Sequence, residues 1–186
     1  CILIAPQCPP GTSWMTKSGD AVIELVDDIL KQVSVADKKR VYLTGFSLGG
    51  MGTWRLLDLR PDLFAAAVPL AGAGNPATAG KLQGVDIWLF HGRRDKFVPV
   101  KYARDMAAAL KKAGAPAKYS ELVAGHLITS MVFNKEDVHQ RLFKQKRERE
   151  QAPLGPPLLH GLHQAQFLQH FGRRPIVGLA HHVTGG

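Results

Sequence analysis

The sequence has few cysteines and no long hydrophobic run. Its 186 residues include only two cysteines, Cys1 and Cys8. They bracket a segment that we expect to be extended, which separates them by about 20 Å at the rise of a strand, outside disulfide reach. No apolar stretch approaches the roughly 20 residues of a membrane-spanning helix. We expect a soluble chain without a membrane span, and the sequence leaves open a cytoplasmic, secreted or periplasmic location.

Acidic residues are absent from residues 151–186, which hold four prolines and five of the eight histidines. This segment also has no sustained periodicity. We therefore predict a catalytic domain over residues 1–147 and a disordered or non-native tail over residues 148–186. The irregular spacing of the histidines argues against a metal site.

The formal net charge of +9 is spread along the chain. Residues 1–134 hold sixteen Lys or Arg against eleven Asp or Glu, and residues 135–186 hold eight against four. No interleaving of basic and aromatic residues accompanies this charge, so we expect no nucleic-acid partner. Arg93, Arg94 and Lys96 form one local cluster, which either attracts an acidic substrate or is simply exposed.

Segments with strand and helix character alternate along the chain. We predict strands at residues 2–5, 41–44, 64–70, 86–90 and 118–123, and helices at residues 20–34, 49–59 and 100–113. A small-residue loop is expected at 71–80, and helical segments from the last strand to about residue 147. The alternation predicts an α/β fold with a doubly wound, mostly parallel sheet. Ligands bind such sheets at the carboxyl ends of the strands.

The most informative pattern is Gly45-Phe46-Ser47-Leu48-Gly49, between a predicted strand and a predicted helix. This G-x-S-x-G spacing is typical of a nucleophile elbow. A serine on so sharp a turn has strained backbone geometry, and we expect that only glycine fits two positions before and after it. Gly50 and Gly52 extend the pattern, since a helix packed close to its parent strand favours small residues.

A serine nucleophile needs a histidine base and an orienting carboxylate, here in the chain order Ser, Asp, His. Asp95 follows the predicted strand at 86–90, and His126 follows the strand at 118–123. Both are expected at the carboxyl edge of the sheet, with Ser47. We interpret Asp95 as the orienting acid and His126 as the general base.

Other residues fit these roles less well. Asp86 begins its strand and should lie at the opposite edge of the sheet. His91 follows the predicted strand at 86–90, which leads to Asp95. Its favoured role is structural: it closes the end of the strand and forms hydrogen bonds with the neighbouring backbone. His139 falls in a charged, helical stretch, and the other five histidines lie beyond residue 159.

Together these residues resemble the α/β-hydrolase superfamily. The features that carry the resemblance, from about Ile2 to about Arg147, are Ala5-Pro6-Gln7-Cys8-Pro9, Trp14, the segment 41–50, His91-Gly92 with Asp95 and Val98-Pro99, and Gly125-His126. More narrowly, the chain is similar to the bacterial group of predicted peptidases and carboxylesterases related to dienelactone hydrolase, phospholipase/carboxylesterase and polyhydroxybutyrate-depolymerase-like enzymes.

The resemblance implies a role for each matching residue. Ser47 is the nucleophile, Asp95 the acid and His126 the base, and the N–H of Leu48 is one oxyanion-hole donor. Trp14 lines the acyl or alcohol pocket, with packing on the core as the alternative. Such enzymes take a second oxyanion donor from a loop after an earlier strand. That loop is not found in this sequence, which predicts an N-terminally incomplete domain lacking the first strands.

The sequence therefore predicts a serine hydrolase that cleaves small carboxylic esters through an acyl-enzyme. No metal or organic cofactor is required. A peptidase of the same fold is one alternative. An inactive fragment or non-catalytic domain is the other, since loss of one oxyanion donor costs about 100- to 1,000-fold in rate. The oligomeric state stays open.

Overall fold

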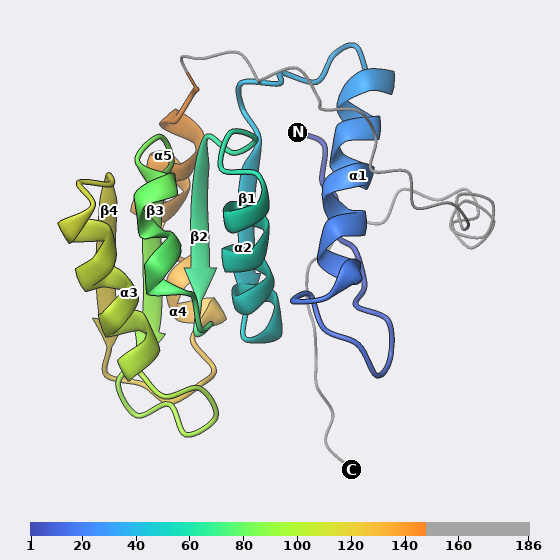
Figure 1. The fold of residues 1–186 in the computed structure, drawn as a ribbon. Coiled ribbons are helices and arrows are strands. Elements are labelled where there is room, and N and C mark those ends of the chain that lie inside the picture. Colours follow the sequence, from blue (N-terminus) through green and yellow to red (C-terminus); the bar gives the residue numbers. More distant parts are fainter. Residues whose placement is uncertain (148–186) are drawn as a thin grey trace. The chain divides into compact units, whose positions relative to one another are not determined.

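The computed structural model describes residues 1–147 (Figure 1). Residues 8–147 belong to one compact unit. Residues 1–7 belong to a different unit and form neither helix nor strand. The predicted tail over residues 148–186 lies outside the described residues.

The centre of the unit is a parallel sheet of four strands in the order β1-β2-β3-β4, which is also their order along the chain. The strands are β1 (Tyr42–Phe46), β2 (Ala66–Leu70), β3 (Asp86–Gly92) and β4 (Ala117–Leu122). Because every pair is parallel, all four carboxyl ends lie at the same edge. This is the lower edge in Figure 1, where the arrowhead of β2 points.

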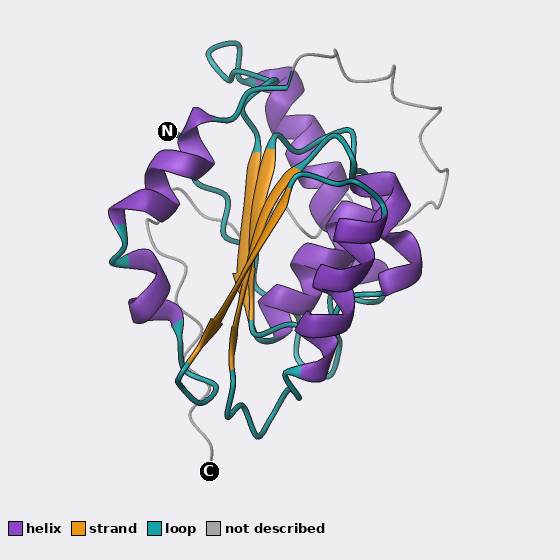
Figure 2. Ribbon diagram, turned by 90° about the vertical axis from the view of Figure 1, so that its left-hand side faces the viewer, coloured by secondary structure: helices purple, strands orange, loops and turns teal. Residues whose placement is uncertain are grey.

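Helices cover both faces of the sheet, as the edge-on view in Figure 2 shows. The helices are α1 (Lys17–Gln32), α2 (Leu48–Leu59), α3 (Lys101–Lys112), α4 (Thr129–Phe133) and α5 (Glu136–Lys144). α2 and α3 pack on one face, and α4 and α5 lie on the other. The predicted doubly wound parallel sheet is confirmed. No helix within residues 1–147 combines the length and the apolar character needed to cross a membrane.

The alternation of side chains along the strands divides the core between the two faces. Ala66, Val68 and Leu70 of β2 pack with Trp88 and Phe90 of β3 beneath α4 and α5. The intervening residues, such as Ala67, Ile87 and Leu89, are equally buried and face α2 and α3. Every residue of β2 is buried. The central strands are thus fixed from both sides, which gives the loops at their carboxyl ends a rigid base.

Two predictions about secondary structure are wrong. Residues 2–5 were predicted as a strand, yet no described strand pairs with them, and Ile2 and Leu3 are 51% and 46% exposed. A short apolar run becomes a strand only where a neighbour takes its backbone hydrogen bonds. The predicted loop at 71–80 contains most of a 3₁₀ helix, η1 (Pro76–Leu82). Asn75 caps it by accepting a hydrogen bond from the N–H of Ala77 at 3.1 Å, and Pro76 suits the first helical position.

Candidate active site

Three side chains from separate loops form one chain of hydrogen bonds at the carboxyl edge of the sheet. Ser47 lies between β1 and α2, Asp95 follows β3, and His126 follows β4. Ser47 Oγ is 2.8 Å from His126 Nε2, and His126 Nδ1 is 2.7 Å from Asp95 Oδ2. The structure thus brings together the three residues that the sequence singled out, in the order Ser47, His126 and Asp95.

The backbone of Ser47 has the geometry expected of a sharp strand-to-helix turn. Its φ is 55° and its ψ is −113°, a conformation that L-residues rarely adopt. The N–H of Ser47 donates to Leu70 O at 2.9 Å, and its carbonyl accepts from the N–H of Met51 at 2.9 Å. These two bonds hold the strained residue between the end of β2 and the first turn of α2.

The glycines around Ser47 differ in what they do. A β-carbon at Gly45 would lie 2.1 Å from the carbonyl oxygen of Gly49, so no larger residue fits there. A β-carbon at Gly49 would meet nothing within 4 Å, so the predicted steric need for glycine at that position is wrong. Gly50 and Gly52 do allow close approach, but to Leu70 O of β2 and to the Trp14 ring respectively.

The side chain of Asp95 is buried and held as an ionised carboxylate. Its side chain has no exposed surface, and Oδ1 accepts from the N–H groups of Phe97 and Val98, both at 2.9 Å. Burial alone would raise the pKa of Asp95, but hydrogen bonds from His126, Val98 and Phe97 outweigh it and the net pKa lies below its ordinary value. The carboxylate is therefore charged at neutral pH.

The charge on Asp95 fixes the tautomer of His126. A carboxylate only accepts hydrogen bonds, so the proton of the neutral imidazole lies on Nδ1, and Nε2 presents a lone pair to the Ser47 hydroxyl. Two aromatic rings contact the imidazole: the Phe46 centroid is 4.8 Å away and the Phe97 centroid 5.1 Å away. Phe97 is nonetheless 80% exposed, so one face of His126 is shielded by a ring that borders solvent.

His91 lies beside the same carboxylate, a contact that sequence reasoning missed. Its Nε2 is 2.9 Å from Val98 O, which agrees with the expected bond to the backbone, and 3.3 Å from Asp95 Oδ2. The four-residue spacing from His91 to Asp95 was visible in the sequence. It carried no prediction because the turn after a strand leaves the direction of a side chain open.

The competing candidates are engaged elsewhere. Asp86 stands at the amino end of β3 and accepts two hydrogen bonds from Arg141, at 2.8 and 2.9 Å. His139 on α5 bonds to Phe133 O at 2.7 Å. Neither side chain forms a hydrogen bond or ion pair with Ser47, Asp95 or His126. Among residues 1–147 no group of three or more potential ligands could hold a metal ion.

The basic cluster near Asp95 is partly neutralised. Arg93 donates to Glu121 Oε1 at 2.8 Å, and Glu121 also accepts from Arg104 and Tyr119. Hydrogen bonds from Arg104 and then Arg93 lower the pKa of Glu121 to about 2. Arg93 therefore fastens the loop that carries Asp95 to β4.

Leu48 and Trp14 occupy different surroundings. Leu48 is the first residue of α2, where the backbone N–H has no partner within the helix. This N–H is therefore available for an oxyanion hole, and that role stays a prediction. Trp14 packs against Gly52 of α2. Its proposed part in a substrate pocket also stays a prediction. Within residues 1–147 the Trp14 ring contacts α2.

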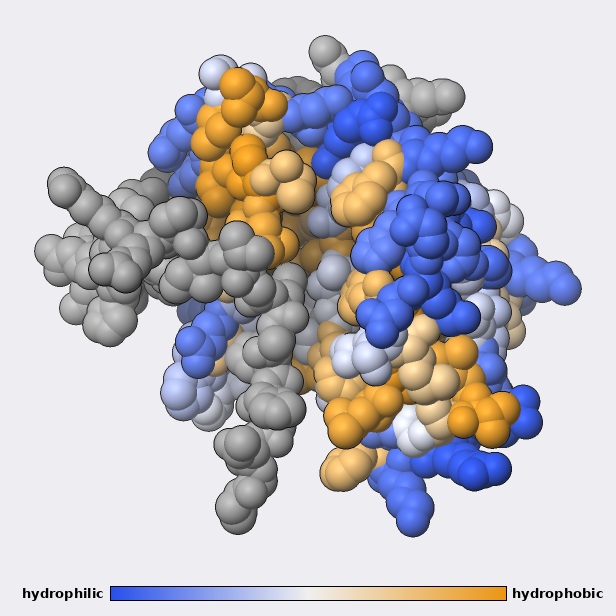
Figure 3. Space-filling model, turned by 180° about the vertical axis from the view of Figure 1, so that it is seen from behind, coloured by the Kyte–Doolittle hydropathy of each residue, from blue (hydrophilic) through white to orange (hydrophobic). Residues whose placement is uncertain are grey.

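Hydrophobic side chains are exposed close to the three residues. Figure 3 shows hydrophobic surface in two places on the face on which α4 and α5 lie, one at the upper left and one at the lower end, where the strands have their carboxyl ends. Leu127, the neighbour of His126, is 79% exposed, and Met131 of α4 is 45% exposed. The surroundings of the candidate site are thus apolar as well as basic.

Solved structures share this arrangement of sheet and helices. A thermostable esterase superposes with a TM-score of 0.70 and 30% sequence identity over 77% of this chain and 44% of that one. An acylaminoacyl peptidase of Pyrococcus horikoshii superposes with a TM-score of 0.57 over 70% of this chain and 26% of that one, at 17% identity, which indicates a shared fold alone. The fold is that of the α/β-hydrolase superfamily.

A family within this superfamily can also be assigned. The model of the dienelactone hydrolase family matches residues 12–126, and the chain belongs to this family. A bifunctional acetylxylan esterase/xylanase of Neocallimastix patriciarum is 34% identical over 80 residues, which are 43% of this chain and 12% of that protein. The chain thus spans less than half the length of both the thermostable esterase and this enzyme.

Proposed function

We propose that the protein is a serine hydrolase that cleaves carboxylic esters, with Ser47 as nucleophile, His126 as base and Asp95 as orienting acid. One observation carries the proposal: the unbroken chain of hydrogen bonds from Ser47 Oγ through His126 to Asp95, at 2.8 and 2.7 Å. A structural serine would not need a strained backbone, a histidine at its hydroxyl and a buried carboxylate behind that histidine.

In the proposed mechanism the proton moves along this chain. Ser47 Oγ attacks the ester carbonyl while its proton passes to Nε2 of His126, and Asp95 stabilises the resulting imidazolium. The N–H of Leu48 donates to the oxyanion. The imidazolium then protonates the departing alcohol, and water, deprotonated by His126, releases the acid from Ser47. This chemistry calls for no metal or organic cofactor.

An ester is the favoured substrate over a peptide. Two relatives at 30% identity or more have esterase in their names. The acylaminoacyl peptidase, at 17% identity, supports the fold and nothing about substrate. A peptidase also needs stronger protonation of its leaving group, so the two activities are separable by comparing a short acyl ester with a peptide amide of the same acyl group.

Labelling with a fluorophosphonate probe tests the nucleophile directly. The 186-residue chain should bind the probe covalently, and Ser47→Ala should not. Ser130→Ala is the matched control, since Ser130 is an exposed serine on α4, and it should label like the wild type. Continued labelling of Ser47→Ala would rule out Ser47 as the nucleophile. Cleavage of the peptide amide without cleavage of the ester would identify the protein as a peptidase instead of an esterase.

A further inference from the structure

The carboxylate of Asp95 has a second histidine beside it that the proposed mechanism does not use. His91 is fully buried, with its Nε2 2.9 Å from Val98 O and 3.3 Å from Asp95 Oδ2. A carbonyl oxygen only accepts hydrogen bonds, so the proton of His91 is on Nε2. The positive end of this N–H bond therefore lies next to the oxygen that binds His126.

Val98 connects His91 to the other oxygen of the same carboxylate. The carbonyl of Val98 accepts from His91, while the N–H of Val98 donates to Asp95 Oδ1 at 2.9 Å. His91 thus anchors to β3 the short turn whose backbone holds Asp95. With one oxygen held by the turn and the other placed between two histidines, the carboxylate has little freedom to rotate away from His126.

The burial of His91 costs free energy that packing alone does not explain. Its Nδ1 is one of three buried side-chain nitrogens in residues 1–147 without a hydrogen-bond partner. An unpaired buried polar atom is destabilising, and an apolar side chain of similar volume would avoid that penalty. His139 makes the same kind of bond to a backbone carbonyl, but on α5 and away from the site.

We propose that His91 is a positioning residue for the triad acid: it holds the 95–98 turn and fixes the Asp95 carboxylate at the angle at which Oδ2 meets His126. The proposal rests on the proposed function of Ser47, His126 and Asp95. His91 acts through Asp95 and does not itself touch the substrate.

Kinetics of matched variants provide the first test. His91→Phe keeps a ring but removes the donor, and we expect kcat for a short acyl ester to fall about 10- to 100-fold with little change in KM. His91→Gln supplies an amide N–H at a similar distance from the backbone and should restore most of kcat. His139→Phe loses the equivalent bond on α5 and should keep the wild-type kcat. If His91→Phe does not fold, His91→Met replaces it as the donor-free partner of His91→Gln.

A double-mutant cycle separates positioning from general destabilisation. In an Asp95→Asn background the acid is already gone, so adding His91→Phe should change kcat by less than about twofold. A fall of the same size in both backgrounds, or a wild-type kcat for His91→Phe, would overturn the proposal.

A spectroscopic signal makes the result independent of catalysis. The downfield proton resonance of His126 Nδ1–H reports its hydrogen bond to Asp95. We expect it to shift or broaden in His91→Phe, to return in His91→Gln and to stay unchanged in His139→Phe. An unchanged resonance in His91→Phe would count against the proposal. If Ser47→Ala still labelled with the fluorophosphonate probe, the proposed function would fail, and this signal would still decide the role of His91.

Discussion

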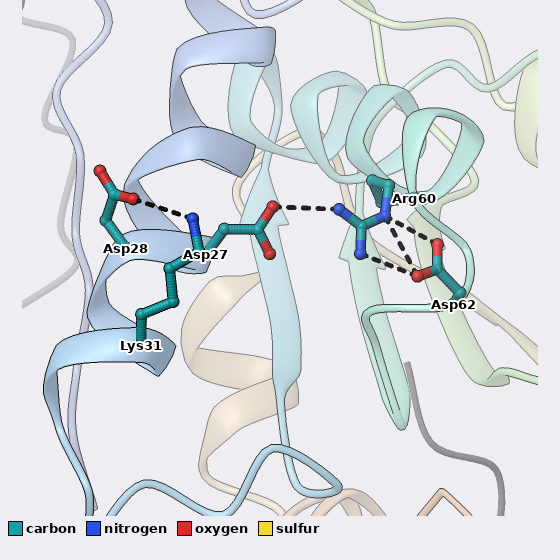
Figure 4. A network of polar contacts seen from close by, with 5 residues as sticks. All are labelled: Asp27, Asp28, Lys31, Arg60 and Asp62. Carbon is teal, nitrogen blue, oxygen red and sulfur yellow. Dashed lines mark hydrogen bonds and ion pairs between the residues drawn. The ribbon is translucent and has the colours of Figure 1, made fainter. Parts of the chain in front are cut away.

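The two ends of α2 carry polar networks of opposite character. At the amino end, Ser47 has a strained backbone and bonds to His126, with the charge of Asp95 buried behind it. At the carboxyl end, Arg60 donates three hydrogen bonds to Asp62 at 2.8 to 3.1 Å and one to Asp27 of α1 at 3.0 Å. Figure 4 shows Arg60 between these two carboxylates, while Lys31 pairs with Asp28 on another side of α1.

The contrast separates a site that can react from one that holds elements together. A guanidinium stays protonated at neutral pH and so passes no proton to its partners, and its positive charge also suits the carboxyl end of a helix. The Ser47 hydroxyl and the imidazole of His126 can pass a proton without breaking the network. Both Asp62 and Asp95 have a lowered pKa, so the partner of a carboxylate tells more about its role than the shift itself.

The largest effect should come from removing charge at the amino end. In Asp95→Asn, an amide cannot fix the Nδ1–H tautomer of His126 as a carboxylate does, and we expect kcat for an ester to fall about 10⁴-fold. The amide oxygen can still accept from Phe97 and Val98, so the variant should fold. Steady-state kinetics and circular dichroism measure the two quantities. Asp62→Asn is the matched control and should keep the wild-type kcat per folded molecule. Equal losses of kcat in the two variants would contradict the difference between the two ends of α2.

The second-largest effect should be a loss of stability when Arg60, at the carboxyl end of α2, is replaced. Arg60→Met removes the link between α1 and the end of α2 and leaves two carboxylates unpaired in a partly buried setting. We expect the free energy of unfolding to fall by about 1–3 kcal/mol, between the values for exposed and buried pairs. Urea denaturation measures the loss.

The exposed pair Lys31–Asp28 provides the control for this change. Its side chains are 55% and 50% exposed, so Lys31→Met should alter stability by less than about 0.5 kcal/mol. Both variants should keep the wild-type kcat per folded molecule. A loss of catalysis in Arg60→Met that exceeds its unfolded fraction would show that the two ends of α2 are coupled.

Much of the fold and the candidate site could be predicted because local patterns specified them. An apolar run before Gly45 and small residues after Ser47 indicated a strand, a sharp turn and a helix. Once the strands were predicted as parallel, Asp95 and His126 followed at the same edge as Ser47, since parallel strands end together. Their hydrogen bonds agree with this reasoning, while their catalytic roles stay predictions.

What could not be predicted depends on contacts between distant or freely oriented groups. Residues 2–5 have the composition of a strand but no described partner strand. The contact between His91 and Asp95 depends on how a four-residue turn directs two side chains, and the ring of Phe97 could equally have turned away from His126. The Asn75-Pro76 pair did signal a helix start, but the small residues around it favoured a loop.

Backbone strain should give smaller effects on stability, and replacement by glycine instead of alanine should have opposite effects at the two ends of α2. Because Ser47 has φ 55°, Ser47→Gly should be more stable than Ser47→Ala by about 1 kcal/mol, the net of relieved strain and added chain entropy. Arg60 has φ −140°, which any residue adopts, so Arg60→Gly should be less stable than Arg60→Ala by about 0.5–1 kcal/mol. Thermal denaturation measures both pairs. Ser47→Gly no more stable than Ser47→Ala would argue against strain at the elbow.

The smallest effect concerns pH and separates the two carboxylates. The hydrogen bond from Arg60, opposed by burial, leaves the pKa of Asp62 below its ordinary value. A lowered folded pKa stabilises the fold above the unfolded value of about 3.9, and this stabilisation is lost as pH falls through the folded pKa. The stability difference between wild type and Arg60→Met should therefore be largest at neutral pH and shrink below about pH 4. Asp95 owes its lowered pKa to His126 and backbone N–H groups, so its acid dependence should persist in Arg60→Met. Urea denaturation at pH 7 and at about pH 3 measures this, and a constant difference would mean that Arg60 does not stabilise the ionised form of Asp62.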